Sequence, residues 1–353
     1  MIAPPLGSAR RIAWTAGGAF AAFYIFYTAA PVAFADASLG AGVRVGIVMA
    51  VVVAVQPFVG LLGRWMATRR QQVTSAAISM GVGSAIMPFA GHWPGMLLLA
   101  IGFGIFVVTS TAWIKETAPA GLLGKALGIY GLGSALGGAL GAPLGLILIG
   151  QFGIPGIATI GSLVALASTL PVLRMSTAVC SDAPPAENIA SESSPRASRL
   201  WSGSGLIGLG AHLLAVTIYA AALSGLASGQ TGRGTWLPVL AAFTIQGSLA
   251  IGRMTGGWAV TRWSPLAVGT SALVLLLLGI TGIALLDPPP ALTLAATIGV
   301  GLASGACQTV ALTWLMQRAD TTAGINKASA AWNICFDIGL GLGALIAGAE
   351  LNR

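Results

Sequence analysis

The sequence predicts an all-α protein that crosses a membrane many times, and three observations lead to this fold class. Hydrophobic residues make up 56% of the chain and charged residues only 7%, whereas soluble domains carry about 25% charged residues. Apolar stretches of about 20 residues, the length that spans a bilayer, recur along the whole chain. The second half also repeats part of the first, as expected of two related helical bundles.

Eleven apolar stretches are long enough to cross a bilayer. Six come first, near residues 12–34, 44–63, 72–91, 94–114, 124–150 and 154–173. Five follow, near residues 203–227, 236–259, 265–286, 290–315 and 327–349. The segment between the two sets is polar and rich in Ser, Pro and Glu, which is typical of a flexible linker. We therefore expect a six-helix bundle over 1–174, a cytoplasmic linker over 175–202 and a five-helix bundle over 203–353.

Basic residues indicate the orientation of the chain. With the N-terminus in the cytoplasm, all but three of the 17 Lys and Arg residues fall at or toward the cytoplasmic side, as the positive-inside rule requires. We expect a multi-pass protein of a bacterial-type cytoplasmic (inner) membrane, with a cytoplasmic N-terminus. The net charge of +8 is then explained by topology and the lipid bilayer, and we expect no nucleic-acid partner.

An internal repeat relates the two halves. The stretch from Lys125 to Leu144 reappears in outline from Lys327 to Ile346, and Gly137 aligns with Gly339. Gly141 and Gly343 also coincide. Glycine at regular spacing lets membrane helices approach closely, so the two copies are predicted to pack alike. Membrane proteins built from such repeats often bind their ligand between the halves.

Short motifs join these features into a family resemblance. The turn after the second span, Gly60-Leu-Leu-Gly-Arg64-Trp-Met-Ala-Thr-Arg69-Arg70, resembles the Gly-x-Leu-Ala-Asp-Arg-x-Gly-Arg-Arg turn of the major facilitator superfamily. Arg64 stands in place of the acid, which puts the charge relay attributed to that acid in doubt. The stretch after the eighth span, with Arg253, Gly257 and Arg262, is similar to a second motif of the family, again without its acid.

A third motif concerns the branch of the family. Gly141, Pro143 and Gly145 are close to the Gly-Pro-x-x-Gly signature of drug:proton antiporters, although ordinary helix packing explains them equally well. Asn333 and Asp337, ahead of the glycine ladder, resemble the arabinose-efflux-permease-like branch. The resemblance implies a major-facilitator-type fold of two pseudo-symmetric bundles. Because that family has twelve spans, the twelfth is expected to be absent from this chain.

The resemblance also implies a function. We expect a secondary active transporter, or permease, that moves a small-molecule substrate by alternating access, with proton-coupled efflux and no cofactor or metal. The chain is expected to act as a monomer. Two alternatives are a non-transporting or degenerate membrane scaffold and, with less support, an intramembrane enzyme. No His-Glu-x-x-His, Gly-x-Ser-x-Gly or phosphate-binding Gly-x-x-x-x-Gly-Lys-Ser/Thr motif occurs, so we expect no enzyme.

Three ionisable residues inside the spans are candidates for proton coupling. Asp337 lies about 15 Å along its helix from Lys327, near mid-membrane, where an acid is either functional or held by a structural hydrogen bond. His212 either relays a proton or donates to a neighbouring helix. Arg253 either pairs with an anion inside the bundle or snorkels to the cytoplasmic surface.

Polar side chains of the first, fourth, seventh and tenth spans are substrate candidates by resemblance, because these spans line the central cavity in the family. They are Tyr24, Tyr27, Thr28, Thr109, Thr111, Thr217, Tyr219, Gln308 and Thr309. Gln246 shares a helix face with Arg253, and Asn333 lies one turn from Asp337, so both join the candidates.

Overall fold

The computed structural model is built of helices, which confirms the predicted fold class. It describes residues 6–33, 41–89, 92–175, 202–228, 236–285 and 290–351, and within these ranges it contains no β-strand. Nearly all of the expected linker at 175–202 lies outside the described residues. Contacts divide the chain into two compact units, and each is described below by itself.

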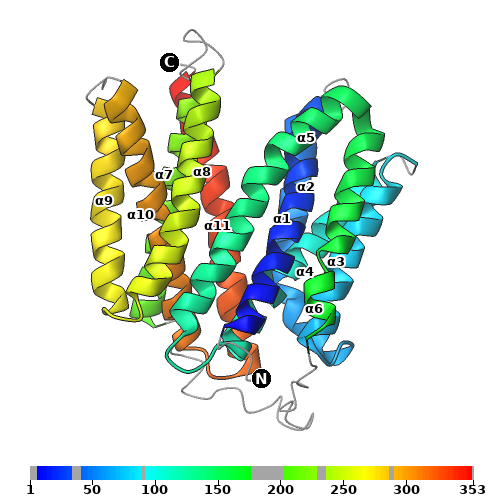
Figure 1. Ribbon diagram of the computed structural model, residues 1–353, viewed down its shortest axis with the longest axis horizontal. Helices are drawn as coiled ribbons and strands as arrows, with labels where there is room; N and C mark the ends of the chain where they lie inside the picture. The colour runs from blue at the N-terminus through cyan, green and yellow to red at the C-terminus, as the bar shows by residue number, and fades with distance from the viewer. Residues whose placement is uncertain are drawn as a thin grey trace. The chain divides into compact units, whose positions relative to one another are not determined.

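The first unit comprises Met1–Ala118, Gly133–Ser194 and Thr321–Ala330. Its helices are α1 (Gly7–Ala33), α2 (Ala41–Val55), the 3-10 helix η1 (Gln56–Arg64), α3 (Arg69–Ile86), α4 (Trp93–Thr117), most of α5 (Leu123–Ala167) and the short α6 (Leu170–Leu173). Figure 1 shows α1 and α5 running alongside one another in this unit.

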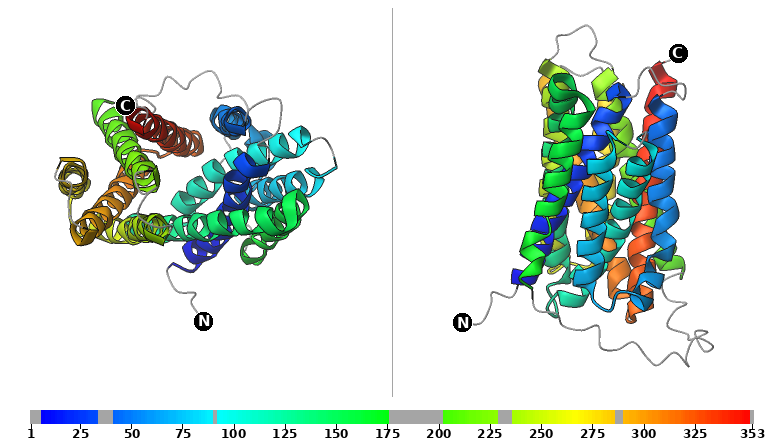
Figure 2. Two further views of the ribbon diagram at one scale, coloured as in Figure 1. Left: turned by 90° about the horizontal axis from the view of Figure 1, so that it is seen from above. Right: turned by 90° about the vertical axis from the view of Figure 1, so that its right-hand side faces the viewer.

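The second unit comprises Pro119–Leu132, Pro195–Asp320 and Ala331–Arg353. Its helices are α7 (Gly203–Ser228), α8 (Trp236–Ala259), α9 (Pro265–Leu285), α10 (Pro290–Gln317) and most of α11 (Thr322–Leu351). The first turns of α5 also belong to this unit, and the first turns of α11 belong to the other. The right-hand view of Figure 2 shows the helices lengthwise, and the left-hand view looks along them.

Helix α5 contains two of the predicted spans. Gly153, with φ 62° and ψ −159°, interrupts it, and Pro155 follows. The continuous segment Leu123–Leu173 has 51 residues, about 76 Å if it were straight, more than twice the thickness of a bilayer core. The chain must therefore turn back at Gly153, a backbone conformation that glycine adopts readily. Counting this segment once, seven of the described helices are long and apolar enough to cross a membrane.

The turn before α3 places Arg69, one of the motif arginines. Thr68 accepts a hydrogen bond from the Gln71 backbone N–H, and the Gln71 side chain accepts one from the Thr68 backbone N–H, both at 3.2 Å. This capping box satisfies backbone donors at the helix start. As a result, α3 begins at Arg69, and the side chain of this residue leaves the first turn of the helix.

Glycines at every fourth position press α5 against α1 in the first unit. A Cβ atom added to Gly133, Gly137, Gly141 or Gly145 would lie only 2.1–2.4 Å from a backbone oxygen of α1. The Thr28 hydroxyl donates to the Ala142 carbonyl across the same contact at 2.8 Å. In lipid, where apolar surface gives no drive for helix association, such close packing holds helices together.

The second unit uses the repeated glycines in the same way. A Cβ atom on Gly339 of α11 would lie 2.8 Å from Val216 Cβ, and one on Gly343 would lie 2.5 Å from the Thr217 carbonyl oxygen of α7. Gly339 and Gly343 are the partners of Gly137 and Gly141 in the sequence repeat. The repeat therefore corresponds to one packing arrangement, α5 on α1 in one unit and α11 on α7 in the other.

We expect Gly137→Val to destabilise the first unit, because its Cβ would meet the Gly17 carbonyl oxygen at 2.1 Å. Overpacking of a close contact costs about 1–3 kcal/mol, so the thermal midpoint of the purified protein in detergent should fall. Gly150→Val is the matched control on the same helix, since nothing lies within 4 Å of a Cβ there. An equal loss in both variants would contradict this explanation.

Candidate functional site

A buried arginine is the centre of a polar cluster in the second unit. Arg253, on α8, is 5% exposed. Its Nε and Nη2 both donate to Gln308 Oε1 of α10, at 3.0 and 2.6 Å, and its Nη1 donates to the Gly131 carbonyl oxygen at 3.3 Å. The guanidinium carbon lies 5.6 Å from the centre of the Phe336 ring. The Arg253 donors therefore bind acceptors inside the unit.

Gln308 is fixed from three sides. Its Nε2 donates to Ser304 Oγ at 3.0 Å, and Ser304 Oγ donates to the Ala215 carbonyl oxygen of α7 at 3.1 Å. The Trp332 indole N–H of α11 donates to the Gln308 backbone carbonyl at 3.1 Å. Because the amide nitrogen is held by Ser304, the amide oxygen must face Arg253. Connected networks of this kind are rigid in a low-dielectric interior.

His212 joins the same cluster from α7. It is fully buried, and its Nε2 lies 3.1 Å from the Trp332 backbone carbonyl. A carbonyl can only accept, so we assign the proton to Nε2 and leave Nδ1 as an acceptor. Within the described residues Nδ1 has no hydrogen-bond partner. This bond joins α7 to α11, and a hydrogen bond to a neighbouring helix is one of the two roles expected for His212.

Aromatic rings stack beside the buried cation. The His212 and Trp332 rings are 4.6 Å apart with an interplanar angle of 12°, and the Trp332 and Phe336 rings are 5.8 Å apart at 17°. Trp332 and Phe336 lie one turn apart on α11, so they share a face of that helix. The cluster therefore combines a fixed positive charge with a set of nearly parallel rings.

A second polar contact joins α7 and α8 about two helical turns away from His212 and Arg253. The Tyr219 hydroxyl donates to Gln246 Oε1. Tyr219 is seven residues beyond His212 on α7, and Gln246 is seven residues before Arg253 on α8, a rise of about 10.5 Å in each helix. The two polar pairs of these neighbouring helices thus stand at matching levels.

Each residue of the aromatic pair on α11 is followed by a polar residue. Asn333 follows Trp332 and is 5% exposed, whereas Asp337 follows Phe336 and is half-buried. They are one helical turn apart and share a face. The structure therefore assembles Asp337, His212 and Arg253 with Gln308, Tyr219, Gln246 and Asn333 in one unit.

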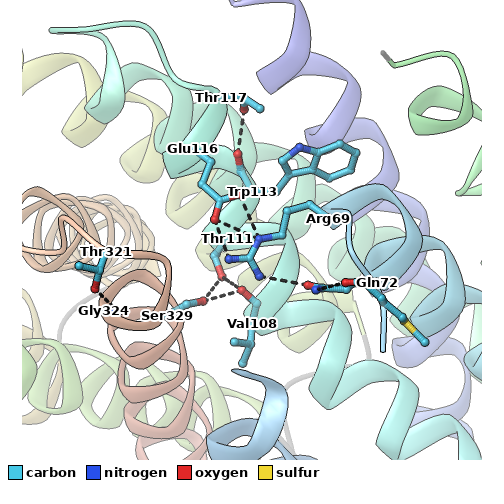
Figure 3. A network of polar contacts seen from close by, with 11 residues as sticks. Arg69, Gln72, Val108, Thr111, Trp113, Glu116, Thr117, Thr321, Gly324 and Ser329 are labelled. Atoms are coloured by element: carbon cyan, nitrogen blue, oxygen red, sulfur yellow. Dashed lines mark hydrogen bonds and ion pairs between the residues drawn. The ribbon is translucent and has the colours of Figure 1, made fainter. Parts of the chain in front are cut away.

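The first unit holds a different polar site, drawn in Figure 3. Arg69, 4% exposed, forms an ion pair with Glu116 at the end of α4, whose side chain is 20% exposed. Arg69 Nε lies 3.1 and 3.0 Å from the two carboxylate oxygens, and Nη2 lies 2.6 Å from Oε1. Arg69 Nη1 also donates to Gln72 Oε1 at 3.1 Å. Arg69 of the motif turn is thus paired with an acid of another helix.

The start of α11 is bound to α4 close to this ion pair. Ser329 Oγ donates to the Val108 carbonyl oxygen at 2.8 Å and also shares a hydrogen bond with Thr111 Oγ1. Figure 3 shows Thr111 and Ser329 beside Arg69 and Glu116. Thr111, proposed as a substrate contact, therefore makes an interhelical contact within the first unit.

The remaining substrate candidates are engaged in local structure. Tyr24 and Tyr27 pack edge to face at 5.8 Å, and each also contacts the Phe23 ring. The hydroxyls of Thr28, Thr109 and Thr217 donate to carbonyls one turn earlier, at 2.7–2.8 Å. Thr309 is buried at 3% exposure.

The remaining motif residues differ in their surroundings. Arg64 is exposed, and Arg70 donates to the Leu173 and Met175 carbonyls at 3.5 and 3.1 Å. Arg262 lies over the Trp258 ring at 4.3 Å. Gly257 contacts the first turns of α5, since a Cβ there would lie 2.3 Å from the Gly124 oxygen. Gly60 faces Asn326, whose side-chain amide nitrogen would lie 3.7 Å from a Cβ atom added at Gly60.

The sequence did not predict several residues of these sites, among them Glu116, Gln72, Ser304, Ser329, Trp332 and Phe336. A signal existed for Glu116, which is an acid at a span end in a chain with only nine acids and must balance basic neighbours. Ser304 and Phe336 carried none, because small and aromatic residues inside apolar spans are ordinary packing residues.

Comparisons with known proteins agree with this architecture. Residues 12–344 match the model of the Major Facilitator Superfamily, while a search of curated proteins finds no match. The structure is similar to the fucose:proton symporter of E. coli, with TM-score 0.69 and 14% identity over 99% of this chain and 92% of that chain.

Two further solved structures show the same fold. One is a human organic anion transporter, with TM-score 0.71 and 17% identity over 98% of this chain and 94% of that chain. The other is a proton:xylose symporter, with TM-score 0.65 and 13% identity over 98% and 89% of the two chains. Since the family model covers nearly the whole sequence, the chain belongs to the Major Facilitator Superfamily, a family of transporters.

Proposed function

We propose that this protein is a proton-coupled secondary transporter that moves a small molecule across the cytoplasmic membrane by alternating access. The observation that carries the proposal is the buried cluster of Arg253, Gln308 and His212 in the second unit. Charged and polar groups are costly inside a bilayer, and where they occur they mark pathways for substrates or protons. An unused packing interface would be built more cheaply from apolar side chains.

Asp337 is the residue we propose as the proton carrier. It is half-buried on α11, directly after Phe336 of the cluster. A carboxyl group in this setting changes between a neutral and an anionic form according to its surroundings. His212 and Arg253, on α7 and α8, are further ionisable groups of the same unit. Asn333, one turn away, is suited to hydrogen-bond either form of the acid.

Efflux is the direction that we propose, with the chain acting as a monomer. The support for efflux is the glycine and proline segment at Gly141, Pro143 and Gly145, which resembles the antiporter signature. In the structure Gly141 and Gly145 are two of the four glycines that form the close contact between α5 and α1. Contacts between small side chains let helices slide past one another, as a transporter that changes conformation requires.

Proteoliposomes test the proposed function. The full-length protein is reconstituted with a pH-sensitive dye inside, and sugars, amino acids, amphiphilic cations and aromatic carboxylates are added in turn. At least one class should move protons faster than in protein-free liposomes, and the same compound should show counterflow of its labelled form. Counterflow without proton movement would contradict proton coupling. The absence of both for every class would favour a scaffold.

A further inference from the structure

We propose that three arginines at one end of the first unit form a binding site for the headgroup of an anionic phospholipid. They are Arg11 of α1, Arg70 in the first turn of α3 and Arg174, which follows α6 directly. The inference concerns the lipid around the protein and does not depend on the proposed transport function. Three features carry it: convergence of the arginines on one helix end, the lack of an acidic partner among the described residues, and an exposed apolar surface beside them.

Hydrogen bonds bring the arginines together at the end of α6. Arg11 Nη1 donates to the Arg174 backbone carbonyl at 3.1 Å. Arg70 Nη1 donates to the Leu173 and Met175 carbonyls at 3.5 and 3.1 Å. Carbonyls at a helix end lack partners within the helix, so these bonds satisfy them. Two guanidinium groups thus meet the backbone around Arg174, whose own side chain starts from the same point.

Helix packing explains why the arginines converge. A Cβ atom added to Gly18 of α1 would lie 2.6 Å from Ser168 Cβ. Seven residues before Gly18 the chain has Arg11, and six residues after Ser168 it has Arg174, about 9–10 Å along a helix in both cases. The capping box at the start of α3 places Arg70 in the first turn of that helix. The positions of the helices therefore set the cluster.

The arginines have no acidic partner within the described ranges of the chain. Arg11 and Arg70 donate to backbone carbonyls, which satisfy N–H groups but carry no net charge. Glu116, an acid of the same unit, forms its ion pair with Arg69. Like charges gathered at one place repel one another. A phosphate group relieves this repulsion, because its oxygens accept charge-assisted hydrogen bonds from several guanidinium groups.

An apolar surface lies beside the arginines and indicates a lipid. Trp14, one turn after Arg11 on α1, is 77% exposed, and Leu170 and Leu173 of α6 are 61% and 48% exposed. Trp14 and Arg11 share a face of their helix, and tryptophan prefers the headgroup level of a bilayer. A phospholipid offers a phosphate to the arginines and acyl chains to this surface, whereas inorganic phosphate would use the arginines alone.

The expected orientation of the chain places the cluster where such lipids occur. Arg11 lies near the N-terminus, on the side that the distribution of basic residues predicts to be cytoplasmic. The cytoplasmic leaflet carries anionic lipids, and basic groups of membrane helices on that side bind their headgroups. All three arginines are at least partly exposed, so a headgroup reaches them from the membrane surface without an enclosed cavity.

Lipid retention by the purified full-length protein tests the inference. The protein in detergent is mixed with equal amounts of phosphatidylglycerol and phosphatidylcholine, and the bound lipids are counted by native mass spectrometry. Wild-type protein should retain phosphatidylglycerol preferentially. The triple variant Arg11→Gln, Arg70→Gln and Arg174→Gln should lose at least about tenfold of this preference, since each basic residue near an anionic surface contributes about fivefold to affinity.

The matched control removes the same charge from positions outside the cluster. It is the triple variant Arg64→Gln, Arg262→Gln and Arg318→Gln, and it should keep the preference for phosphatidylglycerol. An equal loss in both triple variants would overturn the proposal, because the overall charge of the protein, and no particular site, would then attract the lipid. The lack of any preference in the wild type would overturn it as well.

Single variants decide the outcome if the triple variant does not fold. The Arg174 side chain donates no hydrogen bond among the described residues, so Arg174→Gln should fold and retain about fivefold less phosphatidylglycerol. Trp14→Ala should weaken retention several-fold, whereas Trp65→Ala, at another exposed tryptophan, should not. Undiminished retention in Arg174→Gln would overturn the proposal. So would displacement of the lipid by millimolar inorganic phosphate, since the arginines would then bind a free anion.

The chain itself contains a rival source of negative charge. Residues 176–201, which lie outside the described residues, include Asp182, Glu187 and Glu192. Changing these three acids together to Asn, Gln and Gln should leave the retention of phosphatidylglycerol unchanged. A preference that appears only when they are removed would overturn the proposal, because the acids would then occupy the arginines. No transported compound enters these experiments, so their failure leaves the proposed transport function untouched.

Discussion

Asp337→Asn is expected to abolish proton movement while leaving substrate exchange in place. The amide of asparagine is close in shape to a carboxyl group and makes similar hydrogen bonds, but it cannot take up or release a proton. Substrate-dependent proton flux in proteoliposomes should therefore fall at least about tenfold, to the level of protein-free liposomes, because no other intramembrane acid of the described residues replaces it. Counterflow of the labelled substrate should continue.

The separation of these two readouts identifies the role of Asp337. A residue that only holds α11 in place would reduce both activities together when it is changed, since packing supports every step of the cycle. A proton carrier affects the coupled step alone, and exchange of substrate for substrate does not need that step. Asp320→Asn provides the matched control, because Asp320 is an exposed acid between α10 and α11. Undiminished proton flux in Asp337→Asn would remove this residue from the mechanism.

Much of the fold follows from the sequence because lipid leaves the chain few choices. Backbone groups inside a bilayer must be satisfied within each segment, so a long apolar stretch forms a helix. The alignment of Gly137 with Gly339 went further and predicted a shared packing arrangement, since a Cβ at either position meets the first helix of its own unit. The predicted spans 124–150 and 154–173 left a break between them, and the structure places the turn there at Gly153.

The candidate site was predicted less completely, for a physical reason. A polar residue within an apolar span is conspicuous, which is why Arg253, His212, Gln308 and Asp337 could be named from the sequence. Which of them meet depends on helix rotation and tilt, and these are set by packing against neighbours. The same limit left the direction of the Arg253 side chain open. A position in the second half of α8 fits either direction for this long side chain until Gln308 is located opposite it.

The motif turn shows a second limit of reading residues in order along the chain. With Arg64 in place of the family's acid, the sequence indicated a missing charge partner. The acid that pairs with Arg69 is Glu116, on α4, and no local sequence pattern connects Arg69 with Glu116. Arg69 reaches it because the capping box of Thr68 and Gln71 starts α3 at Arg69. The structure thus pairs Arg69 with an acid that lies on a different helix.

Glu116→Gln is accordingly expected to destabilise the first unit substantially. Glutamine keeps one acceptor for Arg69 but removes the negative charge, so a guanidinium that is only 4% exposed stays buried without its ion-pair partner. Breaking a buried pair from one side costs about 3–5 kcal/mol, and since the Glu116 side chain is 20% exposed, we expect about 2 kcal/mol. The thermal midpoint in detergent should fall, and Asp320→Asn, an acid with an exposed side chain, should leave it unchanged.

A double-mutant cycle separates the charge from the packing of these side chains. Arg69→Gln removes the buried cation, so adding Glu116→Gln to it should cost little more than Arg69→Gln alone, because no unpaired charge then remains buried. The Thr111–Ser329 contact lies beside this pair (Figure 3), so loss of the pair should also loosen the start of α11. Faster hydrogen exchange at residues 322–330 in Glu116→Gln is the expected result. Additive effects of the two substitutions, with unchanged exchange there, would mean that the pair is a surface contact of little consequence.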